Sequence, residues 1–418
     1  MSANIESKNR SEELNMIAQE NARHSIRSQD SAVKKRKARL LSYFEATETE
    51  WNSYNWQMKN RISDVKQLND IFKLTRKRFK EIEEVSETYR WSVSPYYLSL
   101  INVHDILDPI GLMAVPSLLE LEAQGEIDPM NEKLTNPAPL ITRRYPDRLI
   151  INVTNLCGVF CRFCQRKRNI GEADCTNAKS DILKAIDFIK KHKYIRDVLI
   201  TGGDPLTLST DYLEMILSKI RKIKHVEMIR IGSRVPVTIP QRIDDDLVNV
   251  LKRYHPLYMN VHFNHPREMT AEAAKACNKL ADAGIPLGNQ MVLLNGVNND
   301  KYLVLALNKA LLKCRVKPYY IFFSKNVKGT MHFNCSIEEG LDIMSFLRGN
   351  VSGLAVPTFI VNAPKGFGKV PILNQNYVIK DNEVELTTWE GKKFSFENPE
   401  SKTISERYDC YHLSASDQ

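Results

Sequence analysis

The sequence has no run of apolar residues near the ~18 that a membrane-spanning helix needs. Its first residues, MSANIESKNRSEELN, are polar and mixed in charge, without the apolar core of a secretory signal. Low-complexity segments and short internal repeats are also missing. We therefore expect a cytoplasmic globular protein that does not contact membranes. Its 418 residues suffice for one large domain with appendages.

Charge excludes little. The formal net charge of +9 suits a solvated surface, a nucleic acid ligand, or an anionic substrate or cofactor. The densest basic run, Lys34–Lys37, lies in a polar region that has little other specificity. One non-enzymatic hypothesis, an iron–sulfur protein that binds nucleic acid, rests on this charge alone. We expect no nucleic acid partner.

Cysteine is sparse except in one segment. Of the eight cysteines, Cys157, Cys161 and Cys164 follow the spacing C-x₃-C-x₂-C. In a long chain without a secretory signal, such a cluster indicates a metal rather than a disulfide framework. Three thiolates can bind three irons of a 4Fe–4S cluster and leave the fourth iron open for a small molecule. Structural zinc takes four ligands, and no fourth Cys or His stands at finger spacing. Three unrelated buried cysteines are the alternative.

From about residue 148, short β-branched runs alternate with amphipathic helical segments. This alternation predicts an α/β fold of parallel strands joined by right-handed crossovers. Without a Rossmann fingerprint it favours a partial (β/α) barrel, and an open doubly wound sheet is the alternative. The expected strands are 149–154, 197–201, 226–232, 257–263, 287–294, 317–324 and 357–361. The expected regions are a helical N-terminal region over 1–140, the barrel over 141–362, and a short C-terminal segment over 363–418.

Polar residues gather near the ends of these strands, which is where barrel enzymes place their chemistry. Gly202-Gly203-Asp204-Pro205 directly follows the second expected strand, and taken alone it is better explained as a tight βα turn. Near the end of the chain, the segment NAPKGFGKVP combines glycines with two lysines. Glycines let backbone amides approach a phosphate, and a lysine amine can bond covalently to pyridoxal phosphate (PLP). On chemistry alone, Lys365 and Lys369 are rivals for that role.

Several segments together resemble the lysine 2,3-aminomutase family of radical S-adenosylmethionine (SAM) enzymes. They span roughly residues 50 to 400 in consistent order: RRYPDRLIINVTNLCGVFCRFCQRKR, DVLITGGDPL, RIGSRVPVTIPQRI, VHFNHP, DAGIPLGNQMVLLNGVN, KPYYIF and VPTFIVNAPKGFGKVP. The resemblance implies a crescent-shaped partial barrel of the radical SAM type. It also implies a 4Fe–4S cluster, SAM and PLP as cofactors, and a flavodoxin or ferredoxin as electron donor. We further expect a homo-oligomer.

The resemblance also assigns site residues. Lys369 is the residue that carries PLP, and Arg144 and Arg148 lie near its phosphate and ring. Arg166 clamps the α-carboxylate of the substrate, a task that suits the planar guanidinium. The residues implied for SAM are Phe163, Gly202, Gly203, Asp204, Ser233, Arg234, His262 and Gln290.

Two departures from the family pattern stand out. Phe163 occupies a position where relatives often have histidine, and its ring can still stack on SAM. Lysine mutases often end in a cysteine-rich zinc segment, whereas the tail RYDCYHLSASDQ has only Cys410. We therefore predict that no zinc is bound.

Two further positions bear on the substrate. In lysine-specific members, two aspartates face the distal ammonium of the substrate, and the matching residues here are Lys325 and Asn362. A cation and a neutral amide suit a side-chain carboxylate instead. We therefore expect glutamate 2,3-aminomutase activity.

The implied reaction uses an electron from the cluster to cleave SAM. Hydrogen is then removed from the β-carbon, the amino group migrates from the α- to the β-carbon, and SAM is regenerated. The alternatives are lysine, another amino acid, or a protein-bound residue as substrate, or a Lys325 that is merely a solvated loop residue.

Overall fold

The computed structural model describes residues 2–23, 30–374, 376–381 and 383–398. These residues form two compact units, which divide between Ile372 and Leu373. The expected tail residue Cys410 lies outside the described residues. No helix in the described ranges combines the length and the apolar character needed to cross a membrane.

Helices of 4 to 22 residues occupy the N-terminal region, as the sequence predicts. Most of them begin at a Ser, Thr or Asp whose side chain accepts a hydrogen bond from a backbone N–H of the first turn, which satisfies otherwise unpaired donors. The helices are α1 (Ser2–Arg23), α2 (Asp30–Tyr43), α3 (Glu48–Trp51), α4 (Tyr54–Lys59), α5 (Val65–Phe72), α6 (Arg76–Thr88), α7 (Pro95–Ser99) and α8 (Pro109–Leu112). Two 3₁₀ turns follow, η1 (Leu118–Leu121) and η2 (Glu132–Thr135).

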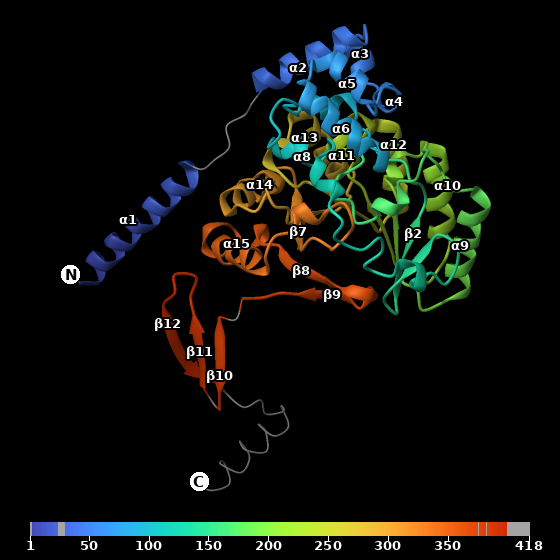
Figure 1. The fold of residues 1–418 in the computed structure, drawn as a ribbon. Coiled ribbons are helices and arrows are strands. Elements are labelled where there is room, and N and C mark those ends of the chain that lie inside the picture. Colours follow the sequence, from blue (N-terminus) through green and yellow to red (C-terminus); the bar gives the residue numbers. More distant parts are fainter. Residues whose placement is uncertain (1, 24–29, 375, 382, 399–418) are drawn as a thin grey trace. The chain divides into compact units, whose positions relative to one another are not determined.

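A nine-stranded curled sheet forms the centre of the larger unit, with its strands in sequence order from β1 to β9 (Figure 1). Strands β2 to β8 are parallel, whereas β1 and β9 are antiparallel at the two edges. The strands are β1 (Ile141–Arg143), β2 (Arg148–Asn152), β3 (Asp197–Thr201), β4 (Met228–Gly232), β5 (Leu257–Val261), β6 (Leu287–Val292), β7 (Val316–Phe322), β8 (Thr358–Ala363) and β9 (Gly368–Pro371). The sheet is thus an open half-barrel, which confirms the expected partial (β/α) barrel.

The crossover helices pack on this sheet through the apolar faces that the sequence pattern predicts. In α9 (Lys179–Lys191) the buried face is Ile182, Ala185, Ile186 and Ile189, and in α10 (Thr210–Arg221) it is Leu213, Ile216, Leu217 and Ile220. Strand β2 alternates between buried and partly exposed residues, so one face meets the helices and the other lines the interior of the half-barrel. The remaining helices are α11 (Val235–Thr238), α12 (Asp245–Leu251), α13 (Ala271–Asp282), α14 (Lys301–Lys313) and α15 (Ile337–Asn350).

All seven expected strands are present, as β2 to β8, and five strands were not anticipated. Strand β1 has three residues and β9 four, too few for a hydrophobic period to be recognised. Because β9 pairs with β8, Lys369 belongs to the half-barrel sheet. The smaller unit holds an antiparallel sheet of β10 (Tyr377–Lys380), β11 (Glu383–Thr387) and β12 (Lys393–Glu397).

Candidate active site

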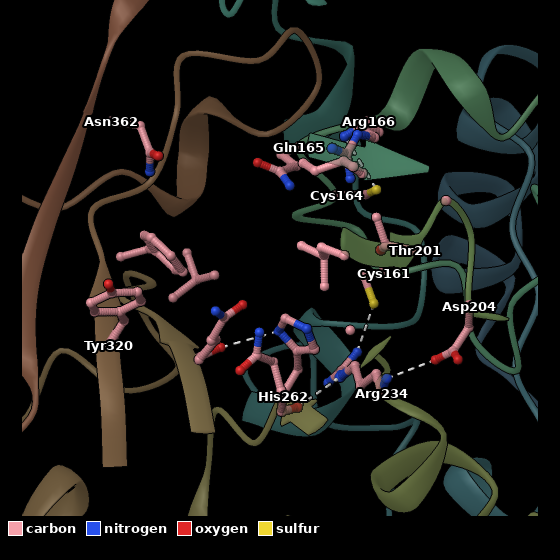
Figure 2. Close-up of a pocket in the computed structure, with 18 of the residues that line it drawn as sticks. Cys161, Cys164, Gln165, Arg166, Thr201, Asp204, Arg234, His262, Tyr320 and Asn362 are labelled. Atoms are coloured by element: carbon pink, nitrogen blue, oxygen red, sulfur yellow. Dashed lines mark hydrogen bonds between the residues drawn. The ribbon is translucent and has the colours of Figure 1, made fainter. Parts of the chain in front are cut away.

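A cavity of about 1190 Å³ lies inside the half-barrel, lined by the inner face of the sheet and by the loops that follow its strands (Figure 2). Its volume exceeds the ~300–1,000 Å³ of ordinary small-molecule sites, so it can hold more than one ligand. Every site residue expected from the sequence lines this cavity except Ser233. Lys365 is not among the lining residues.

The cysteine loop follows β2 and is fixed from the N-terminal region. Arg61 donates through Nη1 to the carbonyl of Cys157 at 2.7 Å. Behind the loop, the fully buried carboxylate of Glu120 accepts from Arg162 Nε at 2.9 Å and pairs with the Lys167 ammonium. A buried carboxylate with two cationic partners tolerates little displacement, because losing either partner leaves an uncompensated charge. The N-terminal helices therefore help to hold the thiols in place.

Two of the three thiols, those of Cys157 and Cys164, are ill suited to remain ligand-free anions. Burial, with the nearby Asp204 carboxylate, raises the pKa of Cys157 well above its usual value, and burial also raises the pKa of Cys164. Bound iron reverses this effect, because a metal supplies the positive charge that a coordinating thiolate needs. Within the described ranges, no three His, Cys, Asp or Glu side chains converge on a position for a single metal ion. The donor set of three thiols on one loop nevertheless fits a cluster in which each thiolate binds its own iron.

The backbone of the turn after β3 packs against the start of the cysteine loop and hydrogen-bonds to it. A Cβ atom at Gly202 would lie 2.6 Å from the carbonyl oxygen of Thr154, and one at Gly203 would lie 2.3 Å from that of Leu156. The Gly203 N–H donates to Thr154 O at 2.5 Å, and the Asp204 N–H donates to Leu156 O at 2.6 Å. Only glycine permits so close an approach. The two glycines thus fix the start of the loop that bears the cysteines.

Asp204 joins the ends of β3 and β4. Its carboxylate accepts from Ser233 Oγ at 2.7 Å, from the Arg234 N–H at 2.7 Å and from the Val235 N–H at 3.0 Å. A fourth bond comes from the Leu206 N–H at 3.1 Å. Burial raises the pKa of Asp204 despite these donors. Both oxygens are engaged within the protein, so Asp204 and Ser233 position neighbouring residues, and only Asp204 reaches the cavity wall.

Arg234 and His262 lie beside Cys161 (Figure 2). Arg234 donates from Nη1 to Cys161 Sγ at 2.8 Å and from Nη2 to Glu268 at 2.7 Å. Burial alone would lower the pKa of Arg234, but the sulfur, Tyr97 and Glu268 together raise it. Burial and the Arg234 charge lower the pKa of His262 to about 4. His262 Nδ1 lies 3.2 Å from the carbonyl of Gln290, so the neutral ring carries its proton there and its other nitrogen is an acceptor.

Glu132 is a site residue that the sequence analysis missed. Its buried carboxylate accepts from Arg166 at 2.9 Å, Arg144 at 3.2 Å and Arg168 at 2.8 Å. Burial alone would raise the pKa of Glu132, but the arginines lower it to about 2. A lone glutamate before the first strand belongs to no recognisable motif, so only the fold reveals it. Three guanidinium groups on one carboxylate leave an excess of positive charge, and Arg144 Nε is buried without a hydrogen-bond partner.

Lys369 faces the cavity from β9. It stands directly opposite Asn362 in the β8–β9 pair, and opposite residues of an antiparallel pair project to the same face. Its ammonium lies 4.7 Å from the centre of the Tyr320 ring. Lys369 is exposed, but it lines the cavity, and desolvation together with Arg230 and Arg148 lowers its pKa to about 8. Lys365 is exposed in the preceding turn. The structure thus brings Lys369, and not Lys365, to the cavity.

Lys325 enters the cavity from the loop after β7. Its ammonium donates to the side-chain oxygen of Gln165, a second residue that the sequence analysis did not single out. Burial, followed by Arg144 and Arg166, lowers the pKa of Lys325 to about 7. Both side chains line the same cavity as Asn362. Figure 2 labels Gln165 and Asn362. In the sequence, Gln165 stands between Cys164 and Arg166, which both belong to recognised motifs, and no pattern singles out the glutamine itself.

Comparison with known proteins bears on this arrangement. A model of the radical SAM superfamily matches residues 151–306, and a model described as lysine-2,3-aminomutase matches residues 344–417. The glutamate 2,3-aminomutase of Clostridioides difficile is 57% identical over 371 residues, which are 88% of each chain. The L-lysine 2,3-aminomutase of Clostridium subterminale is 44% identical, covering 85% of this chain and 86% of its own. That of Methanococcus maripaludis is 46% identical, covering 85% and 83%.

Proposed function

Because the chain belongs to the lysine 2,3-aminomutase family of radical SAM enzymes, we propose that it moves the amino group of L-glutamate from the α- to the β-carbon. The family makes it an isomerase that depends on SAM, a 4Fe–4S cluster and PLP. One observation carries the choice of glutamate. The cavity wall presents Lys325 and Asn362, a cation and an amide, where lysine-specific members are expected to present aspartates.

Cys157, Cys161 and Cys164 would hold the cluster, since they are the thiols that line the cavity. Residues beside the cysteine loop would hold SAM: Phe163, Gly202, Gly203, Arg234, His262 and Gln290. Asp204 and Ser233 would support these residues without touching SAM. The Asp204 carboxylate accepts hydrogen bonds from Ser233 Oγ and from the Arg234 N–H, and this fixes the Arg234 backbone. The bound groups supply the radical and the carrier for the migrating nitrogen, and the protein supplies orientation and exclusion of water.

Lys369 would carry PLP. Its pKa of about 8 leaves a substantial fraction as the neutral amine near physiological pH, and only the neutral amine attacks an aldehyde. Arg148 and Arg144 would face the phosphate and ring. The buried Nε of Arg144 is a donor that lacks a protein partner, as expected of a group that binds an anion.

Arg166 would bind the α-carboxylate of the substrate. Its Nε and Nη2 are held by Glu132, which fixes the plane of the guanidinium and leaves Nη1 as a further donor. Lys325 and Asn362 would bind the carboxylate at the other end of the substrate. The two ends of glutamate would thus be held by different side chains that line one cavity, which orients the α- and β-carbons between them.

The alternative of a nucleic-acid-binding protein gains no support from the basic run. Arg36 of that run donates to the backbone carbonyls of Ser99 at 2.7 Å and Leu100 at 3.4 Å, so it packs against α7. We propose a small amino acid as the substrate, a flavodoxin or ferredoxin as electron donor, and a homo-oligomeric assembly in the cytoplasm. The absence of zinc is likewise a proposal, since it depends on the tail around Cys410.

Lys325→Ala tests the choice of substrate. We expect glutamate turnover to fall on the order of a hundredfold, because a poorly hydrated carboxylate loses the cationic partner that Lys325 provides. Iron, PLP and the rate of SAM cleavage without substrate should be unchanged. Lys328→Ala, an exposed lysine on the same loop, is the matched control. The double variant Lys325→Asp with Asn362→Asp should gain measurable lysine turnover. Full glutamate turnover in Lys325→Ala would contradict the assignment.

A further inference from the structure

We propose that Gln165 is a specificity residue. It holds the Lys325 ammonium through its amide oxygen, and its amide NH₂ donates to the side-chain carboxylate of the substrate. This inference rests on the proposed function, and it adds a third group to the pair that the sequence indicates. Three features of the site carry it: the fixed backbone of Gln165, the polarity of its amide, and its electrical neutrality.

The backbone of Gln165 is held in place by its neighbours. Its two neighbours are anchored, because the Cys164 N–H donates to Cys161 O at 3.1 Å and the Arg166 side chain is held by Glu132. The Arg166 N–H in addition donates to Cys164 Sγ at 3.4 Å. Gln165 is therefore presented from a rigid loop, with its side chain in the cavity beside Arg166 (Figure 2).

The contact with Lys325 fixes the orientation of the amide. When Lys325 is protonated, its ammonium has three donors and no acceptor, so the amide turns its oxygen toward Lys325 and its NH₂ away from it. The amide NH₂ group can donate hydrogen bonds but cannot accept them. With the Lys325 ammonium and the Asn362 amide lining the same cavity, the arrangement favours an acceptor-rich ligand group. A carboxylate meets that requirement, and an ammonium does not.

Neutrality explains why an amide suits this position better than an acid. The nearby carboxylate, Glu132, is already shared among Arg144, Arg166 and Arg168, so it cannot serve as the counter-ion of Lys325. A carboxylate at position 165 would pair with Lys325 permanently and would compete with that of the substrate. The glutamine orients the Lys325 amine and adds no negative charge beside it, so the protonated form remains available to an anionic ligand.

Gln165 also links the two ends of the substrate site, because the next residue is Arg166. Arg166, which is proposed to bind the α-carboxylate, is thus the direct neighbour in sequence of Gln165, which orients Lys325. A substitution at position 165 should therefore weaken substrate binding more than it changes the reactions of the cofactors.

The test compares Gln165→Glu and Gln165→Met in the reconstituted holoenzyme with glutamate as substrate. We expect Gln165→Glu to raise KM on the order of a hundredfold, because the new carboxylate occupies Lys325. Gln165→Met keeps the length of the side chain but loses the amide, and it should raise KM about tenfold. Iron content, the absorbance of bound PLP and uncoupled SAM cleavage should match the wild type in both. Gln124→Glu, a glutamine exposed outside the cavity, is the matched control.

The outcomes separate the inference from the proposed function. If the wild type converts glutamate and both variants keep its KM, the role of Gln165 is wrong while the proposed function stands. If both variants lose iron, Gln165 supports the cysteine loop and is not a specificity residue. If the wild type does not convert glutamate, the proposed function fails first, and the inference fails with it.

Discussion

Cys161→Ser is expected to lose most of its bound iron and to abolish SAM cleavage. A serine hydroxyl does not ionise near neutral pH, so it cannot replace the thiolate that binds one iron of the cluster. Arg234, which donates to this sulfur at 2.8 Å, would in addition lose a partner beside the cluster. Iron analysis and anaerobic assay of methionine release from SAM would measure both effects.

Two other cysteines are suitable controls for this experiment. Cys277 lies buried in α13, and Cys314 follows α14. Neither residue lines the cavity. Cys277→Ser and Cys314→Ser should therefore keep wild-type iron content. Full iron content in Cys161→Ser, or an equal loss in all three variants, would show that the loop 157–164 is not the cluster site.

Lys369→Ala is expected to lose the absorbance of covalently bound PLP and all detectable aminomutase turnover. No other lysine stands on the same face of β9, opposite Asn362 and against the Tyr320 ring. The cluster should remain, because Lys369 lies on the other edge of the sheet from the strand that precedes the cysteine loop. Uncoupled SAM cleavage should therefore persist in this variant, which distinguishes it from Cys161→Ser.

Lys365→Ala provides the control, since Lys365 is exposed in the turn just before β9. This variant should keep both PLP and turnover. Borohydride reduction of the wild-type enzyme followed by peptide mapping should find the label on Lys369. A label on Lys365 would mean that the family motif has been placed in the wrong register.

Much of the half-barrel could be predicted because most of its strands and helices are recognisable from the pattern of apolar residues within each segment. The strands β2 to β8 are short β-branched runs, and the buried faces of α9 and α10 repeat with the helical period. Strands β1 and β9 could not be predicted in this way. Their residues gain stability from pairing with β2 and β8, and this pairing leaves almost no periodic pattern in so few residues.

The same distinction holds in the candidate site. The cysteines could be found because their chemistry requires a fixed spacing on one loop. Glu132 and Gln165 act through partners distant in sequence, Arg166 and Lys325, and only the fold brings these pairs together. For Asp204 and Ser233, the family resemblance implies a place beside SAM, and this stays a prediction. The structure adds a hydrogen bond between their side chains, 2.7 Å long, that the sequence does not reveal.

The most direct test of the account is a competition between substrates. The wild-type enzyme, reconstituted anaerobically with iron, sulfide, PLP, SAM and a reductant, would receive equal concentrations of ¹³C-labelled glutamate and lysine. The site formed by Lys325, Asn362 and Gln165 predicts that NMR will show β-glutamate accumulating while lysine remains unchanged. Faster formation of β-lysine than of β-glutamate would contradict the substrate assignment and leave only the aminomutase family in place.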